Sequence, residues 1–327
     1  MISASPSRVK LLNRLAIFVC CALMLQLSAC TRSSDRSALL TYVPASSFAV
    51  LAVKWHSVMK DQELKRMVKG NEIEKLFEEI GVTSDEVTEF VVFGDLQSSA
   101  GSTGLIAKGS FNSKDIVNSL KKRGWEEQDL EGKRIYVNPR DGSCLTTFDA
   151  KSFMLGTQSG VRATFAARAE PKLGFISNPA YKTLSVRFER KQYPILMIAA
   201  LPQASQDMAS AALKISSTVM DLAGWGPLGE LLNKIGYAKG LSCGISRAND
   251  SFPVEVSAVM KDEDSAKFVA GALGLLKSLG GLAPPNSNSP RDIEAARTLK
   301  SLSIERSGEV VSMRMLMPKA ALRDLNP

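Results

Sequence analysis

Apolar residues recur along the chain at two different periods, and these periods predict strands and helices in turn. Ser47–Trp55 (SFAVLAVKW) is rich in Val, Leu and aromatic residues, which is typical of a strand. In Asn71–Ile80 the apolar residues lie at helical spacing, and Gly81 follows as a C-terminal cap. The same criteria predict strands over Val87–Phe93, Gly104–Phe111 and Gly132–Val137, and a helix from Asn112 to Arg123. The predicted order is therefore β-α-β-β-α-β.

The second part of the chain repeats this order. The predicted elements are strands over Tyr193–Leu201, Tyr237–Ile245 and Val254–Met260, helices over Gln203–Leu222 and from Asp262 to about Leu279, and a strand or hairpin over Leu302–Met317. Landmarks recur at nearly one offset, since Asn112 and Asp262 are 150 residues apart and Phe93 and Ile245 are 152 apart. We therefore expect an α+β fold of two tandem ferredoxin-like (β-α-β-β-α-β) halves, at 42–190 and 191–327, which can share one antiparallel sheet face. A single large α+β sheet is the alternative.

The first half carries an additional segment. Arg140–Gly142 is a hairpin signal, followed by a short strand at Phe153–Gly156 and by helices at Val161–Ala169 and Pro179–Phe188. In the second half, Pro284–Pro290 is too rich in proline for a helix or a central strand, and we expect an exposed loop.

The N-terminus has the three regions of an export signal in order. Arg8, Lys10 and Arg14 give it a positive charge, and Leu15–Leu25 is an unbroken apolar run. A helix of this length rises about 16 Å, roughly half the thickness of a bilayer core, so it is too short to span a membrane. Leu27–Cys30 (LSAC) follows directly.

These four residues match a lipobox, and the N-terminus resembles a bacterial lipoprotein precursor. The resemblance implies that residues 1–29 are removed, that Cys30 becomes an acylated first residue, and that residues 30–41 form a polar tether. Two or three acyl chains hold a protein on a bilayer nearly permanently. Thr31 stands at the position where an aspartate typically signals retention in the inner membrane, so in a Gram-negative cell the sequence favours the periplasmic face of the outer membrane. In a cell with a single membrane, the expected location is the outer face of that membrane. The alternative is an ordinary secretory signal that contains a cysteine.

The sequence does not indicate a nucleic-acid partner, and its modest positive charge bears on solubility more than on partners. The chain carries a net +8, and removing residues 1–29 removes three positive charges, which leaves +5 on 298 residues. The tryptophans at 55, 125 and 225 lie far apart, without the aromatic and basic stripe that single strands require.

The chain has few residues that suit catalysis or metal binding. His56 is the only histidine, which excludes multi-histidine metal sites. Ser57 and Lys60 form an S-x-x-K pattern that could make a serine–lysine nucleophile, although such short patterns arise by chance. Gly224–Gly229 matches a G-x-G-x-x-G motif but lies after a predicted helix, where it indicates a turn. We expect no metal and no cofactor, and Asp262–Asp264 is expected to cap a helix.

Two cysteines remain after Cys30. Cys144 and Cys243 each lie within a predicted strand, and an oxidising compartment would allow a disulfide between them. Two independent buried thiols are the favoured alternative. Met313, Met315 and Met317 alternate along the last strand and are expected to fill the core, not to bind a soft metal.

The mature part loosely resembles uncharacterised exported bacterial proteins, through the short segments Tyr42–Ala45, Leu155–Thr157 and Asn178–Ala180. That group implies no activity and no site residues. The leading hypothesis is therefore a lipid-anchored, non-enzymatic envelope protein for interaction or scaffolding, bound to the bilayer through acylated Cys30. A periplasmic module that binds a small apolar or acyl ligand is the second hypothesis, and a hydrolase using Ser57 and Lys60 is the third.

Overall fold

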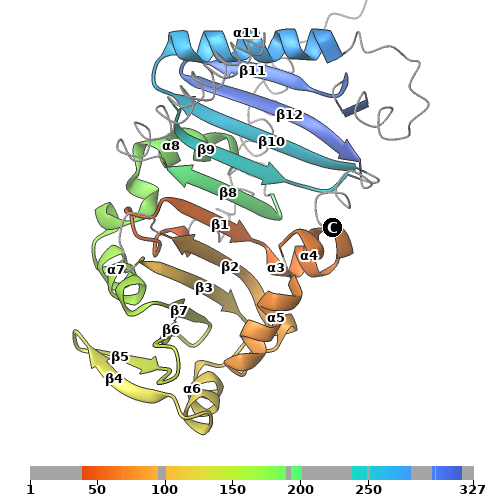
Figure 1. Ribbon diagram of the computed structural model, residues 1–327. Coiled ribbons are helices and arrows are strands. Elements are labelled where there is room, and N and C mark those ends of the chain that lie inside the picture. The colour runs from red at the N-terminus through yellow and green to blue at the C-terminus, as the bar shows by residue number, and fades with distance from the viewer. Residues whose placement is uncertain are drawn as a thin grey trace, which may run out of the picture.

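The computed structural model describes residues 39–68, 70–94, 101–188, 193–200, 238–248, 251–280, 297–298 and 300–318. They form one antiparallel sheet of twelve strands with helices on both faces (Figure 1). The strands are β1 (Ala49–Val53), β2 (Val87–Gly94), β3 (Thr103–Gly109), β4 (Glu126–Leu130), β5 (Lys133–Val137), β6 (Cys144–Asp149), β7 (Ser152–Gly156), β8 (Ile195–Ala200), β9 (Ala238–Ile245), β10 (Ser251–Met260), β11 (Ser303–Ser307) and β12 (Val310–Pro318). The helices are α3 (Trp55–Met59), α4 (Gln62–Met67), α5 (Gly70–Glu79), α6 (Ser113–Lys122), α7 (Gln158–Ala169), α8 (Pro179–Phe188) and α11 (Glu263–Gly280), with short 3-10 helices at Ser84–Glu86, Pro171–Leu173 and Phe175–Ser177.

The expected α+β class is confirmed, and the two parts of the chain share one continuous sheet. The strand order is β11-β12-β10-β9-β8-β1-β2-β3-β7-β6-β5-β4, so the parts meet where β1 pairs with β8. This pair has five register positions, from Ala49↔Ala199 to Val53↔Ile195. From the junction, β1-β2-β3 run outward in chain order on one side and β8-β9-β10 on the other. The tandem ferredoxin-like arrangement is not confirmed, because β1 and β2 are antiparallel neighbours although helices connect them.

Side-chain caps fix where several helices begin. Asn112 precedes α6, and its side chain accepts a hydrogen bond from the amide of Lys114 at 3.1 Å. Asp262 precedes α11 and accepts one from the amide of Ser265 at 2.7 Å. Such caps satisfy amides that have no partner within the helix. The sequence placed both helices correctly because the capping residues stand directly before the apolar periodicity.

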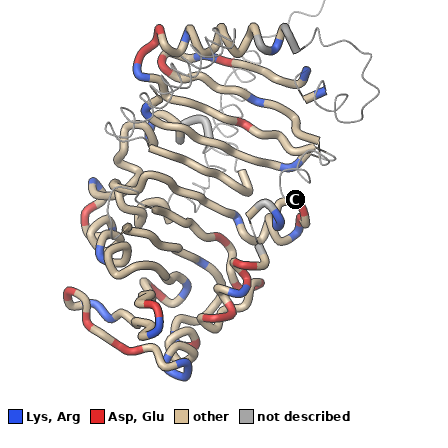
Figure 2. The backbone as a smooth tube through the Cα atoms, viewed as in Figure 1, with Lys and Arg blue, Asp and Glu red and all other residues tan. Residues whose placement is uncertain are grey.

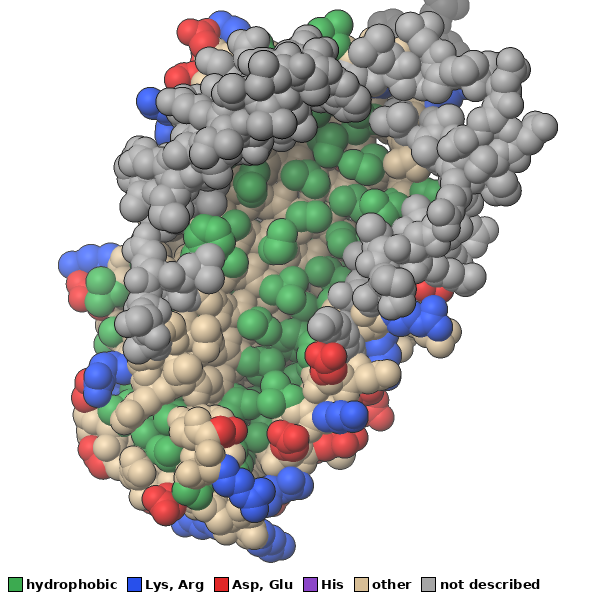
Figure 3. Space-filling model, viewed as in Figure 1, with side chains coloured by type: hydrophobic (Ala, Val, Ile, Leu, Met, Phe, Trp, Pro, Cys, Tyr) green, Lys and Arg blue, Asp and Glu red, His purple; other side chains and the backbone are tan. Residues whose placement is uncertain are grey.

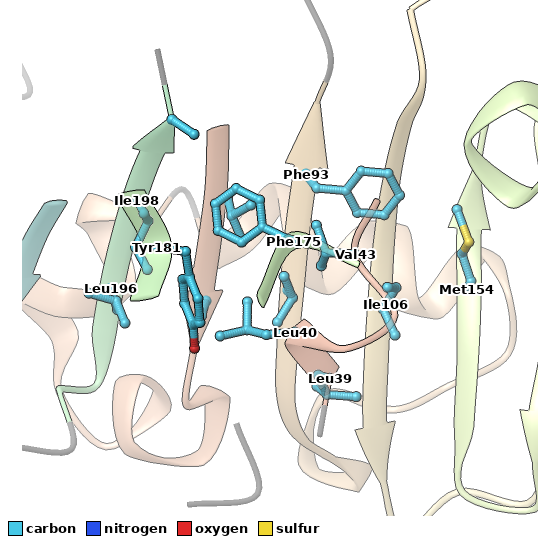
Figure 4. Close-up of a cluster of buried hydrophobic side chains, with 14 of the residues drawn as sticks. Leu39, Leu40, Val43, Phe93, Ile106, Met154, Phe175, Tyr181, Leu196 and Ile198 are labelled. Atoms are coloured by element: carbon cyan, nitrogen blue, oxygen red, sulfur yellow. The ribbon is translucent and has the colours of Figure 1, made fainter. Parts of the chain in front are cut away.

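One face of the sheet, which we call the back face, carries the side chains of Val50 and Ile198 and is covered by α7, α8 and the first described residues. Leu39, Leu40, Val43, Phe175 and Tyr181 pack onto this face over the central strands (Figure 4). The Phe175 and Tyr181 rings lie 5.4 Å apart. Leu39 and Leu40 fall within the segment expected to be a polar tether, yet each is only 2% exposed, so the folded body starts before residue 42.

Among the residues that the structure describes, two separate groups of helices cover the opposite face, which we call the front face. Helices α3 to α6 pack over the strands of the first part, where Trp55, Phe77 and Phe90 form a fully buried aromatic cluster. Trp55 Nε1 donates to the Ser84 hydroxyl at 2.9 Å, which satisfies the one polar atom of that side chain. Helix α11 packs over β10, β11 and β12 at the other end, through Ala266 and Val269 among others.

An ion pair joins the first cover to the second part of the chain. Asp61 caps α4 by accepting from the amides of Glu63 at 3.0 Å and Leu64 at 3.3 Å. Its other oxygen accepts from Arg247 Nη1 at 2.5 Å, just beyond the end of β9. This contact links residues 186 positions apart.

The two edge strands are the most polar ones. In β4 the residues from Glu126 to Asp129 are all exposed, and in β11 only Ile304 is partly buried. Sequence patterning missed β4, because a strand with no buried face except Leu130 has no apolar alternation to detect. Figure 2 shows few charged residues on the central strands β1 and β8, whose sequences contain none.

Several predictions fall outside the described residues. These are the signal region with Cys30, the helix over Gln203–Leu222, the glycine motif at Gly224–Gly229 and the loop at Pro284–Pro290. Among the described helices, none is both long enough and apolar enough to cross a bilayer.

Candidate functional site: an apolar band on the sheet

One row of side chains crosses the front face of the whole sheet. Paired residues of neighbouring antiparallel strands point to the same face, so the register defines the row. From β4 to β11 the row is Glu127, Tyr136, Leu145, Leu155, Leu105, Val92, Leu51, Met197, Cys243, Val256, Met313 and Ile304. Eleven of these twelve positions are apolar.

The row is buried at its first end and becomes accessible in its middle. Leu145 is 0% exposed and Leu105 is 6% exposed, because α3 to α6 cover the first part. Met197, on the central strand β8, is 47% exposed. Its neighbours in the row, Leu51 and Cys243, are half-buried. The helices of the described part of the chain therefore do not cover the interval around Met197 on the front face.

We call this accessible interval the apolar band. We define it by eight half-buried or exposed front-face side chains of β1, β8, β9, β10 and β12: Leu51, Met197, Ala199, Cys243, Ile245, Val256, Met313 and Met315. Figure 3 shows hydrophobic side chains gathered over the middle of the molecule. Contiguous apolar surface of this kind marks a binding site more often than scattered single side chains do.

The band offers almost no hydrogen-bonding groups. Strands β8, β9 and β10 each pair with a neighbour on both sides, so their backbone amides and carbonyls are engaged within the sheet. Burial raises the pKa of the Cys243 thiol, which stays neutral and behaves as a small apolar group. Met197, Met313 and Met315 are flexible and polarisable, and such residues adapt to ligands of irregular shape. A ligand here gains free energy from apolar contact alone.

The size of the band suits a hydrocarbon chain. From Leu51 to Met313 the band crosses four strand spacings of about 4.8 Å each, which gives about 19 Å. One acyl layer fills about half of a bilayer core of roughly 30 Å, so an acyl chain spans about 15 Å. An extended chain therefore fits within the band.

The structure does not assemble a catalytic group around the residues that the sequence offered. His56, Ser57 and Lys60 all lie exposed on or next to the short helix α3. A serine–lysine pair requires a desolvated lysine, and the exposure of Lys60 does not provide one.

The disulfide that the sequence allowed is absent. Cys144 and Cys243 are both free thiols. Cys144 is on β6 and Cys243 on β9, six strand spacings away, or about 29 Å. A disulfide requires Cα atoms within about 7 Å, so no bond can form within the folded chain. Sequence spacing could not show this, because it does not reveal strand order.

The other predicted residues take structural positions. Asp262 caps α11, while Glu263 pairs with Arg306 at 2.8 Å and Asp264 with Lys267 at 3.4 Å. The described residues contain no cluster of three or more side chains suited to hold a metal ion. The methionines at 313, 315 and 317 share the front face as predicted, but they are half-buried and not fully packed in a core.

Comparisons with known proteins do not assign the chain to a family. No protein-family model matches it, and no curated protein matches it. Crystal forms III, I and IV of TP0453 are similar in structure, with TM-scores of 0.46, 0.43 and 0.46 and 11% sequence identity in each case. These matches cover 87–88% of this chain and 95–96% of the other. A likeness of this degree establishes neither a shared family nor a shared function.

Proposed function

We propose that this protein is a non-enzymatic, lipid-anchored protein of the bacterial envelope that binds acyl chains on its apolar band. The observation that carries the proposal is the accessible middle of the front face, where Met197 is 47% exposed on a central strand. A central strand normally has both faces covered or one polar face, whereas β8 has a covered back face and an apolar, accessible Met197 on its front face.

An acyl chain suits the band better than a peptide does. A bound peptide would bury amides and carbonyls against side chains that cannot hydrogen-bond, and each unsatisfied group costs about 1–3 kcal/mol. A hydrocarbon chain has no such groups and gains about 0.8 kcal/mol for each buried CH₂. The lipobox at Leu27–Cys30 adds a reason for this occupant, because an acylated Cys30 would hold the band next to a membrane that supplies acyl chains.

The location follows from the same anchor. We propose that Cys30 is acylated and that the body lies on the periplasmic face of the outer membrane, or on the outer face of the membrane in a cell with one membrane. Intact-mass analysis of the native protein tests this, because the expected mass is that of a chain starting at Cys30 with attached acyl groups. An uncleaved chain or an unmodified thiol would contradict it.

A matched pair of variants tests acyl binding on the band. Met197 and Leu316 are 47% and 43% exposed, and both lie on strands, but Leu316 points to the back face. We expect Met197→Asp to weaken the binding of a fluorescent long-chain fatty acid at least tenfold, because it places a carboxylate in the band. Leu316→Asp adds the same charge at similar exposure on the other face, and we expect less than a twofold change.

Two further results would decide the matter. Native mass spectrometry of protein purified from its source should show the added mass of a bound molecule. Extraction with organic solvent should release that molecule as a lipid. Equal loss of fatty-acid binding in the two variants, or no binding by the unaltered protein, would refute the proposal. A retained polypeptide in place of a lipid would favour the scaffolding alternative.

A further inference from the structure

A cavity lies far from the apolar band, where the β4–β5 hairpin separates from the rest of the sheet. β5 pairs with β6 only at Tyr136↔Leu145 and Val137↔Cys144, next to the turn that joins them. Farther from the turn, the Thr146 hydroxyl donates to the Arg134 carbonyl at 3.0 Å. The strands diverge there, and a cavity of about 590 Å³ opens between β5, β6, α6 and α7.

Positive charge dominates the wall of this basic cavity. Its lining includes Lys114, Lys133, Arg134 and Arg168, and it includes no Asp or Glu. Arg134 Nε pairs with Glu127 at 2.8 Å, which partly neutralises it. For the other three cations, no ion pair is found within the part of the chain that the structure describes. A hollow lined by one sign of charge concentrates the opposite charge.

Aromatic rings hold two of these cations without neutralising them. Lys133 Nζ lies 4.2 Å from the centroid of the Phe165 ring. The Arg168 guanidinium lies 5.2 Å from the ring of Phe148 and 5.5 Å from that of Tyr42. A cation over an aromatic face is held in position and keeps its full charge. Arg168 Nη1 also donates to the Phe148 carbonyl at 3.5 Å, which leaves the other guanidinium N–H groups and the Lys133 ammonium as donors for another partner. The cavity therefore has positioned cations and an apolar floor together.

We propose that the basic cavity is a binding site for a phosphate-bearing ligand that also has an organic group. A phosphate carries up to two charges and several acceptor oxygens, which suits two lysine ammonium groups and a guanidinium that binds oxyanions through two parallel hydrogen bonds. The volume suits a small molecule and exceeds what a single ion needs. Phe148 and Phe165 supply apolar contact for the organic group. This proposal does not depend on acyl binding by the apolar band.

The ligand could be a soluble phosphate ester or the headgroup of a lipid, and the probes distinguish these sources. Phenyl phosphate and inorganic pyrophosphate are titrated by calorimetry into the full protein, and flotation uses phosphatidylcholine vesicles with and without phosphatidic acid. Binding of phenyl phosphate supports a soluble ester. Binding only to the vesicles with phosphatidic acid supports a headgroup.

Helix α6 supplies a control of the same chemical type. Lys114 lines the cavity, whereas Lys122 is exposed at the other end of the helix and does not. We expect Lys114→Gln and Lys133→Gln each to weaken the binding of the bound probe five- to tenfold, and Lys122→Gln to weaken it less than twofold. All three remove one positive charge, so only position distinguishes them. Thermal unfolding of each variant checks that it folds.

Three results would overturn the proposal. The first is that neither soluble probe nor phosphatidic acid binds. The second is that Lys122→Gln and Lys133→Gln lose binding equally. The third is that a polycarboxylate such as citrate binds as tightly as phenyl phosphate does. The first would show no anion site, the second a diffuse charge effect, and the third a site that does not select phosphate.

Discussion

The ion pair between Asp61 and Arg247 gives a quantitative test of how the two parts of the chain are held together. Asp61 is 5% exposed and makes two kinds of contact, a helix cap on α4 and a charge-assisted hydrogen bond to Arg247. Truncating either side chain removes a different subset of these contacts. A double-mutant cycle therefore separates the contributions.

The expected magnitudes follow from the contacts. Loss of the cap costs about 1 kcal/mol. The ion pair contributes about 1 kcal/mol, and not the 3–5 kcal/mol of a fully buried pair, because the Arg247 side chain is 47% exposed and water screens it. We therefore expect Asp61→Ala to cost about 2 kcal/mol, Arg247→Ala about 1, and the double variant about 2. The coupling between the two sites is then about 1 kcal/mol.

Urea unfolding followed by tryptophan fluorescence measures these values, since Trp55 is fully buried in the helices next to α4. Asp61→Asn serves as a control, because asparagine keeps the cap and loses the charge, and we expect it to cost about 1 kcal/mol or less. Added salt should reduce the coupling and leave the cap contribution unchanged. A coupling below about 0.3 kcal/mol at low salt would refute the reasoning, because the additivity of independent sites holds within that range.

Three further predictions concern stability. Gly109→Ala should cost about 3 kcal/mol in urea unfolding, because a Cβ there would lie 1.9 Å from the Glu86 carbonyl oxygen; a cost below 1 kcal/mol would show that the backbone moves freely. Gly274→Ala should raise the thermal midpoint of unfolding and add about 0.5–1 kcal/mol to the free energy of unfolding, because the residue lies in α11 and nothing is within 4 Å of the new Cβ. A lower midpoint would contradict this. Tyr193→Phe should cost about 1.5–3 kcal/mol at pH 7, because its buried hydroxyl donates to Glu255 at 2.7 Å. Burial and this hydrogen bond raise the pKa of Tyr193, so its contribution is complete below pH 10 and is lost as the pH rises through the folded value; unfolding curves above pH 10 should approach those of the variant.

The sequence predicted the elements better than their arrangement. The strand at β1 and the helices at α5, α6 and α11 were correct, because their apolar periods and caps are local signals. The order of the strands depends on pairings over long distances, such as β1 with β8, which no local pattern contains. For the same reason, the sequence alone could not decide whether Cys144 and Cys243 form a disulfide.

The apolar band was partly visible in the sequence. Alternation showed that Met313 and Met315 share one face, and the apolar run over Tyr193–Leu201 predicted the strand β8. Only the register shows that Met197 lies in the same row as Cys243 and Met313, and only the positions of the helices show that this interval is accessible. The basic cavity had no sequence signal, because its four cations come from three separate elements, α6, β5 and α7.

The polar edge strands affect how copies of this protein can contact one another. An open sheet of twelve strands ends in two rows of backbone groups, and such rows recruit the edge of another copy into a growing fibre. The run Glu126–Asp129 places three carboxylates along one rim, and Glu305 and Arg306 charge the other. Two copies that met edge to edge would have to desolvate these charges, and this cost opposes the pairing of one sheet edge with another.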